Sequence, residues 1–160
     1  MDVKLQEWLK NYQIAYNIYT HPAVFTVEEA KLHCGHIPGM KCKNLFLKDV
    51  KGRNYFLVTI PAMKKLDFDQ FAKIVNLPVV KFANDEELQG FLGLSKGAVS
   101  PLGLINDENN KVLYLIDKDV WTSEIVTFHP NINTETLELT QEAYQLLVKC
   151  TGNKFQIIEY

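Results

Sequence analysis

The chain has 160 residues, of which 47% are apolar and 22% charged, the composition of an ordinary globular domain. It contains no apolar run long enough to cross a membrane, and its N-terminus lacks the apolar core of a signal peptide, so we expect neither a membrane protein nor a secreted precursor. Three scattered cysteines do not make a disulfide framework, which predicts a cytoplasmic location. We therefore expect a single domain over residues 1–160.

The net charge of −2 is unevenly distributed. Residues 41–65 carry seven basic residues and one acid, whereas residues 66–160 carry seven more acids than bases. This basic block is either an anion-binding face or a pair of solvated strands, and its composition leaves both open. Six of its seven basic residues are lysines, so bidentate clamping of phosphate is not the expected mode.

Before the basic block, apolar periodicity and capping residues predict two helices and a strand. Helical spacing predicts a helix over residues 2–12, and strict alternation then predicts a strand over 14–18. Thr26 and Glu29 form a capping-box pattern that opens a second helix, which ends before Gly35.

The basic block itself has the pattern of a β-hairpin. Its strands are expected over residues 42–48 and 54–60, and the second is so rich in β-favouring residues that it predicts a central strand. Lys43 begins the first strand, and alternation places it on one face with Leu45 and Leu47. A lysine on such a face either extends along it to solvent or points at a ligand anion, and both interpretations stay open.

The second half of the chain predicts three helices and four strands. The helices begin at the N-cap residues Asp67, Asn84 and Thr140. Residues 93–103 contain three glycines and one proline, which predicts a loop with unusual backbone demands. Helices and strands mix without regular βα alternation, which predicts an α+β fold around a mixed, mainly antiparallel sheet. The strands are expected over 111–116, 124–128, 134–138 and 155–158.

No motif of the common nucleotide-binding or hydrolase classes occurs: the chain has no phosphate-binding GxxxxGK[ST] loop, no GxGxxG and no GxSxG. His33, Cys34, His36 and Cys42 form the one metal-like cluster, but the spacing is not that of a zinc site. The alternative is a polar helix end followed by a buried cysteine. We predict no metal and no cofactor, and we expect the three cysteines to be structural thiols, because no group orients a base beside them.

Two histidines and one loop are candidates for chemistry. His21 and His129 each precede a proline at a predicted strand end, where a side chain can be either structural or functional. The segment Gly97-Ala98-Val99-Ser100-Pro101 combines small residues with a rigid end. Its backbone N–H groups could line an anion or oxyanion pocket, although a plain loop has the same composition.

Four stretches in combination resemble the YbaK/ProX family of aminoacyl-tRNA editing domains, which are freestanding relatives of the insertion domain of bacterial prolyl-tRNA synthetases. They are HPAVFTVEEA at 21–30, KNLFLKD at 43–49, GAVSPLGLIND at 97–107 and FHPNINTETLEL at 128–139. Within the family, the HPAVFT opening and the HPN–NT stretch are most similar to the alanyl-tRNA(Pro) deacylase branch. The resemblance implies a YbaK-like fold and hydrolysis of the ester that joins a mischarged amino acid to the tRNA 3′ end.

The resemblance also implies residue roles. Lys43 would anchor the 3′-terminal phosphate or ribose, and the backbone of the 97–101 loop would hold the oxyanion. His129 would position the substrate beside the amino-acid pocket, with proton transfer as the alternative role. A ribose hydroxyl of the substrate would assist the attacking water, so neither a triad nor a metal is needed. Adjacency adds Ser100 as a catalytic candidate and Asn44 as a substrate-binding one. The other substrate-binding candidates are Ala98, Val99, Pro101, His21 and Asn131, and the tRNA-binding candidates are Lys41, Lys48, Lys51, Arg53, Lys64 and Lys65.

The expected partner is the acceptor end of an aminoacylated tRNA, bound in a salt-sensitive way, with transient contact to prolyl-tRNA synthetase and none to membrane or DNA. A small pocket would admit alanine and clash with the proline ring, while admitting glycine or serine to some degree. The alternatives are a non-catalytic tRNA-binding or regulatory module on the same fold, a metal-dependent protein and a scaffold domain.

Overall fold

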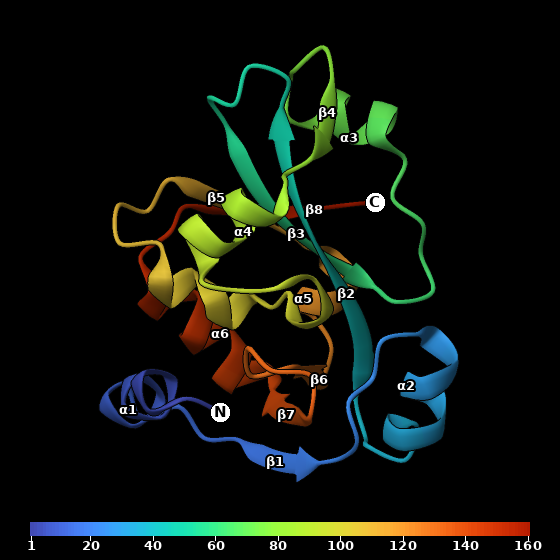
Figure 1. The fold of residues 1–160 in the computed structure, drawn as a ribbon, viewed down its shortest axis with the longest axis vertical. Coiled ribbons are helices and arrows are strands. Elements are labelled where there is room, and N and C mark those ends of the chain that lie inside the picture. Colours follow the sequence, from blue (N-terminus) through green and yellow to red (C-terminus); the bar gives the residue numbers. More distant parts are fainter.

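An eight-stranded mixed sheet forms the centre of the structure, a computed structural model that describes residues 1–160 (Figure 1). The strand order is β1-β7-β6-β2-β3-β5-β8, and β4 pairs with β2 off this path. Four of the seven strand pairings are antiparallel, which confirms the α+β prediction. The strands are β1 (Asn17–Thr20), β2 (Met40–Asp49), β3 (Tyr55–Pro61), β4 (Val80–Phe82), β5 (Val112–Asp117), β6 (Ile125–Phe128), β7 (Glu135–Thr140) and β8 (Phe155–Ile158).

Six α-helices and two short 3-10 helices surround the sheet. Capping side chains start most of them: Thr26, Asp67, Asn84 and Thr140 each accept a backbone N–H of the first turn, as their positions in the sequence predict. The helices are α1 (Val3–Asn11), α2 (Val27–Cys34), α3 (Phe68–Ile74), α4 (Asp85–Leu92), α5 (Lys118–Trp121), α6 (Gln141–Thr151), and the 3-10 helices η1 (Lys96–Ala98) and η2 (Pro101–Asn106).

The two faces of the sheet are covered by different helices. A cluster of 22 buried residues packs α1, α4, η2 and α6 against one face. A second cluster of nine packs α3 against the other face. Helix α2 is held by only three buried residues, Val24, Cys34 and Ile37, and it stands beside the lower end of β2 (Figure 1).

Strand β2 has an open edge at its centre. On the side away from β3 it pairs with β6 only at Met40 and Lys41, and with β4 only over Leu47–Asp49. Residues 42–45 therefore have a strand neighbour on one side only. An unpaired strand edge leaves backbone N–H and C=O groups without partners in the sheet.

Three sequence predictions need correction. The strand expected over 14–18 begins at Asn17, because Gln13 turns with a positive φ of 55° and Ile14 is buried against α1 instead. The final helix extends beyond Val148 to Thr151, where Gly152 ends it with a φ of 80°. The segment expected to be a loop over 93–103 contains η1 and the start of η2. In addition, the three-residue strand β4 was not predicted.

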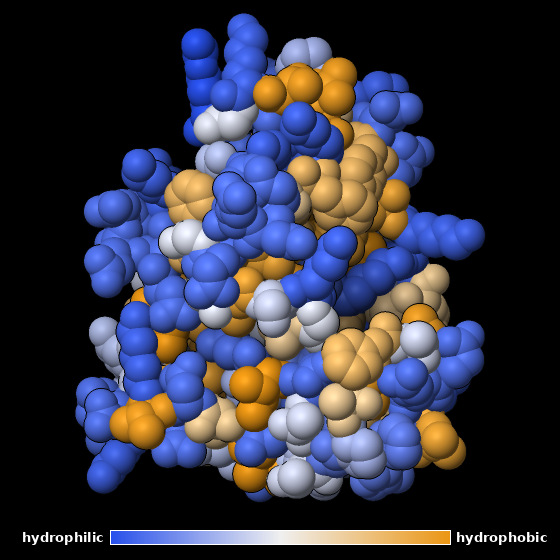
Figure 2. All heavy atoms as spheres, in the orientation of Figure 1, coloured by the Kyte–Doolittle hydropathy of each residue, from blue (hydrophilic) through white to orange (hydrophobic).

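The face seen in Figure 2 is mostly hydrophilic, with one group of hydrophobic atoms toward the end where β4 and α3 lie and smaller groups elsewhere. Phe82 is 56% exposed there and packs edge-to-face on Phe68, with 5.1 Å between ring centroids. None of the helices has the length and apolar character that spanning a membrane requires.

Candidate active site

The 97–101 loop is fastened to the sheet through Asn44. The Asn44 side-chain amide donates to the Val99 carbonyl at 3.3 Å. Because the carbonyl and the following N–H of a trans peptide point in opposite directions, the Ser100 N–H points away from Asn44. Neither the Val99 nor the Ser100 N–H donates to a backbone carbonyl. Val99 is extended, with φ −65° and ψ 128°, so these two N–H groups point in different directions. The Ser100 N–H is thus a single free backbone donor in the clamped peptide, and such a donor can contribute to holding an oxyanion.

The side chains of this loop contribute less than its backbone. Ala98, Ser100 and Pro101 are buried, so they cannot offer side chains to a ligand. The Ser100 hydroxyl accepts the Leu102 N–H at 3.2 Å and caps η2. This cap accounts for Ser100 and gives no support to a catalytic role for its hydroxyl.

Gly97 lies between the segments that flank the loop. An ideal Cβ at this residue would be 3.4 Å from Asn133 Nδ2 and 3.6 Å from the Phe25 ring. Asn133 in turn donates to the Val24 carbonyl at 3.4 Å. The 21–26, 97–101 and 129–133 segments therefore meet at Gly97, although they are far apart in the sequence.

His21 holds the 21–26 segment in place through two hydrogen bonds. Its Nδ1 lies 2.8 Å from the Pro22 carbonyl and its Nε2 lies 2.8 Å from the Thr136 hydroxyl. A carbonyl only accepts, so Nδ1 carries the proton and Nε2 accepts from Thr136. Both ring nitrogens are used and the residue is buried, so the structure gives His21 a role in the fold, and its contact with substrate stays a prediction.

His129 differs from His21 because only one of its two ring nitrogens makes a hydrogen bond. Its Nδ1 donates to the Glu135 carbonyl at 2.9 Å, and no hydrogen bond engages Nε2. Burial lowers the pKa of His129 from its ordinary value of 6.5, and the nearby His21 lowers it further, against the opposing effect of the Glu135 carbonyl. The two imidazole rings are 6.0 Å apart. His129 is therefore a neutral imidazole that presents a lone pair.

Asn131, two residues further on, has a buried amide with no partner. Neither its Oδ1 nor its Nδ2 makes a hydrogen bond, and its backbone adopts a φ of 65°. An unpaired buried amide costs about 1–3 kcal/mol, so native proteins seldom keep one without a reason.

Lys43 stands at the open edge of β2 and makes no ion pair. Alternation puts it on the face opposite Asn44, with Leu45 and Leu47, which pack into the second cluster as predicted. Burial, and then the charge of Lys65, lowers the pKa of Lys43. No contact joins Lys43 to the 97–101 loop, which is bonded to Asn44 on the opposite face of β2.

The other basic residues do not form one continuous anion-binding face. Lys48 pairs with Glu87 at 2.5 Å, and Lys41 donates to the Ile37 carbonyl, so both are engaged within the chain. Lys51 and Arg53 are exposed in the β2–β3 turn. This turn is six or more residues from Lys43 along β2, which corresponds to roughly 20 Å. Lys65 is the basic residue left exposed beside Lys43.

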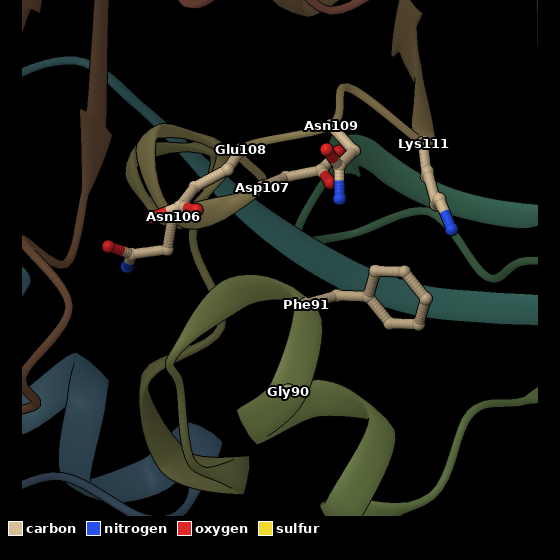
Figure 3. A pocket seen from close by; sticks show the side chains of 7 residues that line it. All are labelled: Gly90, Phe91, Asn106, Asp107, Glu108, Asn109 and Lys111. Carbon is tan, nitrogen blue, oxygen red and sulfur yellow. The ribbon is translucent and has the colours of Figure 1, made fainter.

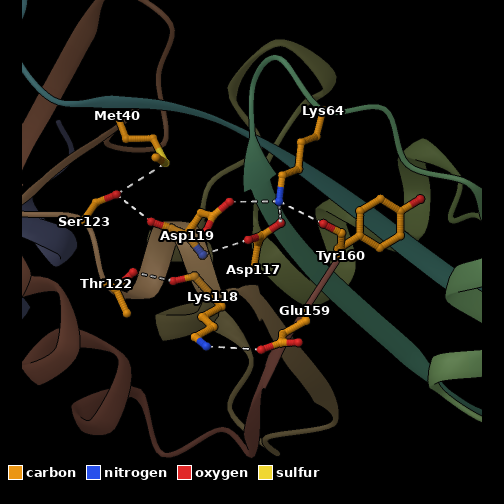
Figure 4. Close-up of polar contacts among 9 residues, drawn as sticks. All are labelled: Met40, Lys64, Asp117, Lys118, Asp119, Thr122, Ser123, Glu159 and Tyr160. Atoms are coloured by element: carbon orange, nitrogen blue, oxygen red, sulfur yellow. Dashed lines mark hydrogen bonds and ion pairs between the residues drawn. The ribbon is translucent and has the colours of Figure 1, made fainter.

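Lys64 is committed to the structure. It bridges Asp117 at 2.8 Å, Asp119 at 3.0 Å and the Tyr160 carbonyl at 2.9 Å (Figure 4). The hydrogen bond with Asp117 is the main reason that the pKa of Lys64 is raised. Lys64 thus ties the segment after β3 to the C-terminal end of the chain, which leaves little of its charge for tRNA.

The cysteines and the metal-like cluster supply no further chemistry. Cys34 is buried, and burial raises the pKa of the Cys42 thiol to about 12, so neither is a ready nucleophile. The donor geometry groups no three His, Cys, Asp or Glu side chains around a common point, so His33, Cys34, His36 and Cys42 do not converge.

A polar hollow of about 370 Å³ lies at the other end of η2, away from the 97–101 loop (Figure 3). Two of its five polar side chains are bonded within the chain: Asp107 accepts from the Val112 N–H and from Asn153, and Asn106 donates to the Leu92 carbonyl. These bonds give Asn106 and Asp107 a structural role at the hollow.

A family model described as the aminoacyl-tRNA editing domain matches residues 21–147. The chain belongs to this family. The prolyl-tRNA editing protein ProX of Acetoanaerobium sticklandii is 37% identical over 152 residues, which are 94% of this chain and 92% of that protein. The mouse (Mus musculus) prolyl-tRNA synthetase associated domain-containing protein 1 is 32% identical over 161 residues, covering 98% and 95% of the two chains.

Among solved structures, a candidate trans-editing enzyme for prolyl tRNA synthetase superposes with a TM-score of 0.74 at 21% identity, covering 100% of this chain and 99% of that one. That likeness shows the fold alone. Membership of the editing family makes the chain an aminoacyl-tRNA deacylase.

Sequence reasoning missed two residues at this site. Phe25 is 75% exposed although it borders Gly97, and Asn133 ties its loop to Val24. A phenylalanine directly before a helix N-cap normally packs as a hydrophobic staple, so its sequence position gave no sign of exposure.

Proposed function

We propose that this protein is a trans-editing enzyme that hydrolyses mischarged tRNA(Pro), with alanyl-tRNA(Pro) as its main substrate. The observation that carries the proposal is the clamped Val99–Ser100 peptide, whose free Ser100 N–H lies in a loop that meets the 21–26 and 129–133 segments. Such donors stabilise the negative charge that develops on an ester carbonyl during attack by water. The names of the ProX and mouse relatives support prolyl-tRNA as the tRNA involved.

In this mechanism a water oxygen attacks the ester carbonyl and the tRNA 3′ oxygen leaves. The proton lost by the water passes through the neighbouring ribose hydroxyl to the leaving oxygen, so no base from the chain is consumed. The chain's contribution is to position the ester and stabilise the oxyanion at the Ser100 N–H. This explains why the site needs no activated cysteine or serine.

The remaining site residues bind the substrate. His129 Nε2 accepts a hydrogen bond from the aminoacyl group or the ribose, since its neutral form presents a lone pair there. The amide of Asn131 pairs with the α-amino group or the carbonyl and so gains the partner it lacks. Phe25 stacks on the terminal adenine, because an exposed aromatic ring is a base platform worth about 1–3 kcal/mol.

Lys43 and Lys65 bind the 3′-terminal phosphate. Two neighbouring ammonium groups repel each other, and a phosphate between them removes that repulsion. This assignment predicts a small footprint at the acceptor end and binding that weakens with salt. Any contact with prolyl-tRNA synthetase is then transient and separate from the ester.

The test is turnover of defined esters. The full chain, at substoichiometric concentration, is incubated with alanyl-, cysteinyl- and prolyl-tRNA(Pro), beside its Lys43→Ala variant. We expect multiple turnovers on the alanyl ester, sparing of the prolyl ester, and a raised KM for Lys43→Ala. Cleavage of no ester above the spontaneous rate would refute the catalytic proposal and favour a non-catalytic tRNA-binding module.

A further inference from the structure

We propose that a buried chain of hydroxyl groups, formed by Tyr144, Tyr114 and Thr59, holds the 97–101 loop in its working orientation through Asn44. Thr59 and Tyr114 are then positioning residues for the ester hydrolysis, which they never touch. This inference rests on the proposed function, and we call the three residues the hydroxyl chain.

The contacts run without a gap from α6 to the loop. The Tyr144 and Tyr114 hydroxyls are 2.7 Å apart, and the Tyr114 hydroxyl is 2.8 Å from Thr59 Oγ1. The Thr59 hydroxyl donates to Asn44 Oδ1 at 2.5 Å, and Asn44 Nδ2 donates to the Val99 carbonyl. Thr59, Tyr114 and Tyr144 are all 0% exposed. Side chains from α6, β5, β3 and β2 thus reach the loop in series.

Only one arrangement of protons satisfies this chain. The Val99 carbonyl accepts, so Asn44 must turn its NH2 to the loop and its oxygen to Thr59. Thr59 gives its only proton to Asn44 and must accept from Tyr114, and Tyr114 must for the same reason accept from Tyr144. The direction of donation is therefore fixed from Tyr144 to Val99, and the flipped orientation of Asn44 is excluded.

The chain also keeps this direction over the whole working pH range. Burial raises the pKa of Tyr114, and burial followed by the charge of Tyr114 raises the pKa of Tyr144. Both phenols stay protonated, so Tyr114 always has a proton for Thr59. The orientation of the Asn44 amide does not switch with pH.

Packing alone does not explain these hydroxyls. Tyr114 and Tyr144 lie in the large apolar cluster, where phenylalanine would fill nearly the same space without burying a polar atom. A satisfied polar network inside an apolar core favours one orientation of its members over others. Here the oriented member is Asn44, and the group it orients is the peptide that carries the Ser100 N–H.

The test compares two valine substitutions of buried strand threonines. Thr59→Val removes the hydroxyl that orients Asn44. Thr127→Val is the matched control, because Thr127 is 5% exposed on β6 and its hydroxyl bonds only to the Met40 carbonyl, outside the chain. Thr59→Ser keeps the hydroxyl and serves as the rescue variant. Kinetics of alanyl-tRNA(Pro) hydrolysis are measured for all three and for Asn44→Ala.

We expect Thr59→Val to lower kcat by about 10- to 100-fold with KM nearly unchanged, since small displacements at a reacting centre have effects of this size. Thr59→Ser should recover most of the rate, and Thr127→Val should keep it. The double variant Thr59→Val/Asn44→Ala should have the same kcat as Asn44→Ala alone. A kcat for Thr59→Val equal to that of Thr127→Val, or additive effects in the double variant, would overturn the proposal.

A readout without substrate separates this inference from the proposed function. In 1H–15N spectra of the free protein, Thr59→Val should shift the Gly97–Ser100 amide signals, whereas Thr127→Val should leave them in place. If the wild-type protein hydrolyses no aminoacyl ester but these shifts occur, the proposed function fails and the orienting chain stands. If the loop signals stay unchanged in Thr59→Val, the chain does not orient the loop, whatever the activity.

Discussion

A methyl group added at residue 97 should slow ester hydrolysis without weakening the fold. Gly97 does not have a positive φ, and the ideal Cβ would meet Asn133 Nδ2 at 3.4 Å and two Phe25 ring carbons at 3.6 and 3.7 Å. These are ordinary van der Waals distances, so Gly97→Ala should change the free energy of unfolding by no more than about 0.5 kcal/mol.

The activity should respond very differently, because the methyl occupies the gap between Phe25 and Asn133. If the ester rests against the backbone there, its carbonyl is displaced from the Ser100 N–H by about the radius of a methyl group. A misplacement of about 1 Å can reduce the rate by about 100-fold. We therefore expect kcat/KM for alanyl-tRNA(Pro) to fall by one to two orders of magnitude, that is, by about 10- to 100-fold.

Gly103→Ala provides the contrast at the other end of the same loop. There the ideal Cβ lies 2.6 Å from Leu94 Cδ1 and 3.1 Å from the Leu92 carbonyl, so something must shift. Overpacking of this kind costs about 1–3 kcal/mol. The melting temperature should drop by roughly 2–4 °C for each kcal/mol lost.

The assay pairs thermal unfolding with single-turnover hydrolysis for both variants and for Gly90→Ala. Gly90 has no atom within 4 Å of its ideal Cβ, and in the helix interior alanine is favoured over glycine by about 0.5–1 kcal/mol, so this control should be slightly stabilised and fully active. Full activity of Gly97→Ala would refute the argument that substrate approaches the loop backbone. A large loss of its stability would refute the packing argument.

The remaining predictions concern single side chains. Phe25→Ala should raise KM about tenfold or more, whereas Leu32→Ala, which changes an equally exposed side chain on α2, should leave KM unchanged. Kinetics on minihelices that end in adenine or in an abasic nucleotide would test the stacking. Hydrolysis should be insensitive to pH above 6.5 and should decline only below it, as His129 gains a proton and loses its Nε2 lone pair; a decline centred above 6.5 would contradict the lowered pKa. Lys64→Met should destabilise the fold by about 1–3 kcal/mol, because Asp117 is 1% exposed and loses its cation, and denaturant unfolding measures this without reference to activity.

Much of the fold follows from local signals in the sequence. The caps at Thr26, Asn84 and Thr140 act within one helical turn, and the alternation of the hairpin strands needs only their own residues, so both were predictable. The strand expected over 14–18 was wrong because alternation at Ile14 reflects burial against α1, a tertiary contact that mimics a strand pattern. Strand β4 has three residues, too few for periodicity to show.

The candidate site was predictable in its segments but not in its chemistry. Four stretches of the chain indicated the family, which the match over residues 21–147 confirms. Which histidine is free is a different matter, because His21 and His129 both precede proline and only the positions of Thr136 and Glu135 distinguish them. The sequence also does not show which lysines of the basic block are neutralised, because the acids that pair with Lys48 and Lys64 are far away in sequence.

The ties that assemble the site also bear on selectivity. A pocket favours a substrate by at most about 1–3 kcal/mol for each methylene it contacts, so rejection of the larger prolyl group must come from overlap. Overlap discriminates only if the walls do not yield. Here each wall is a backbone segment held by a hydrogen bond to another element: His21 to Thr136, Asn133 to Val24, and Asn44 to Val99. On the proposed function, the bonds that orient the loop therefore also hold these segments in place, and we expect them to contribute to the rejection of the prolyl ester.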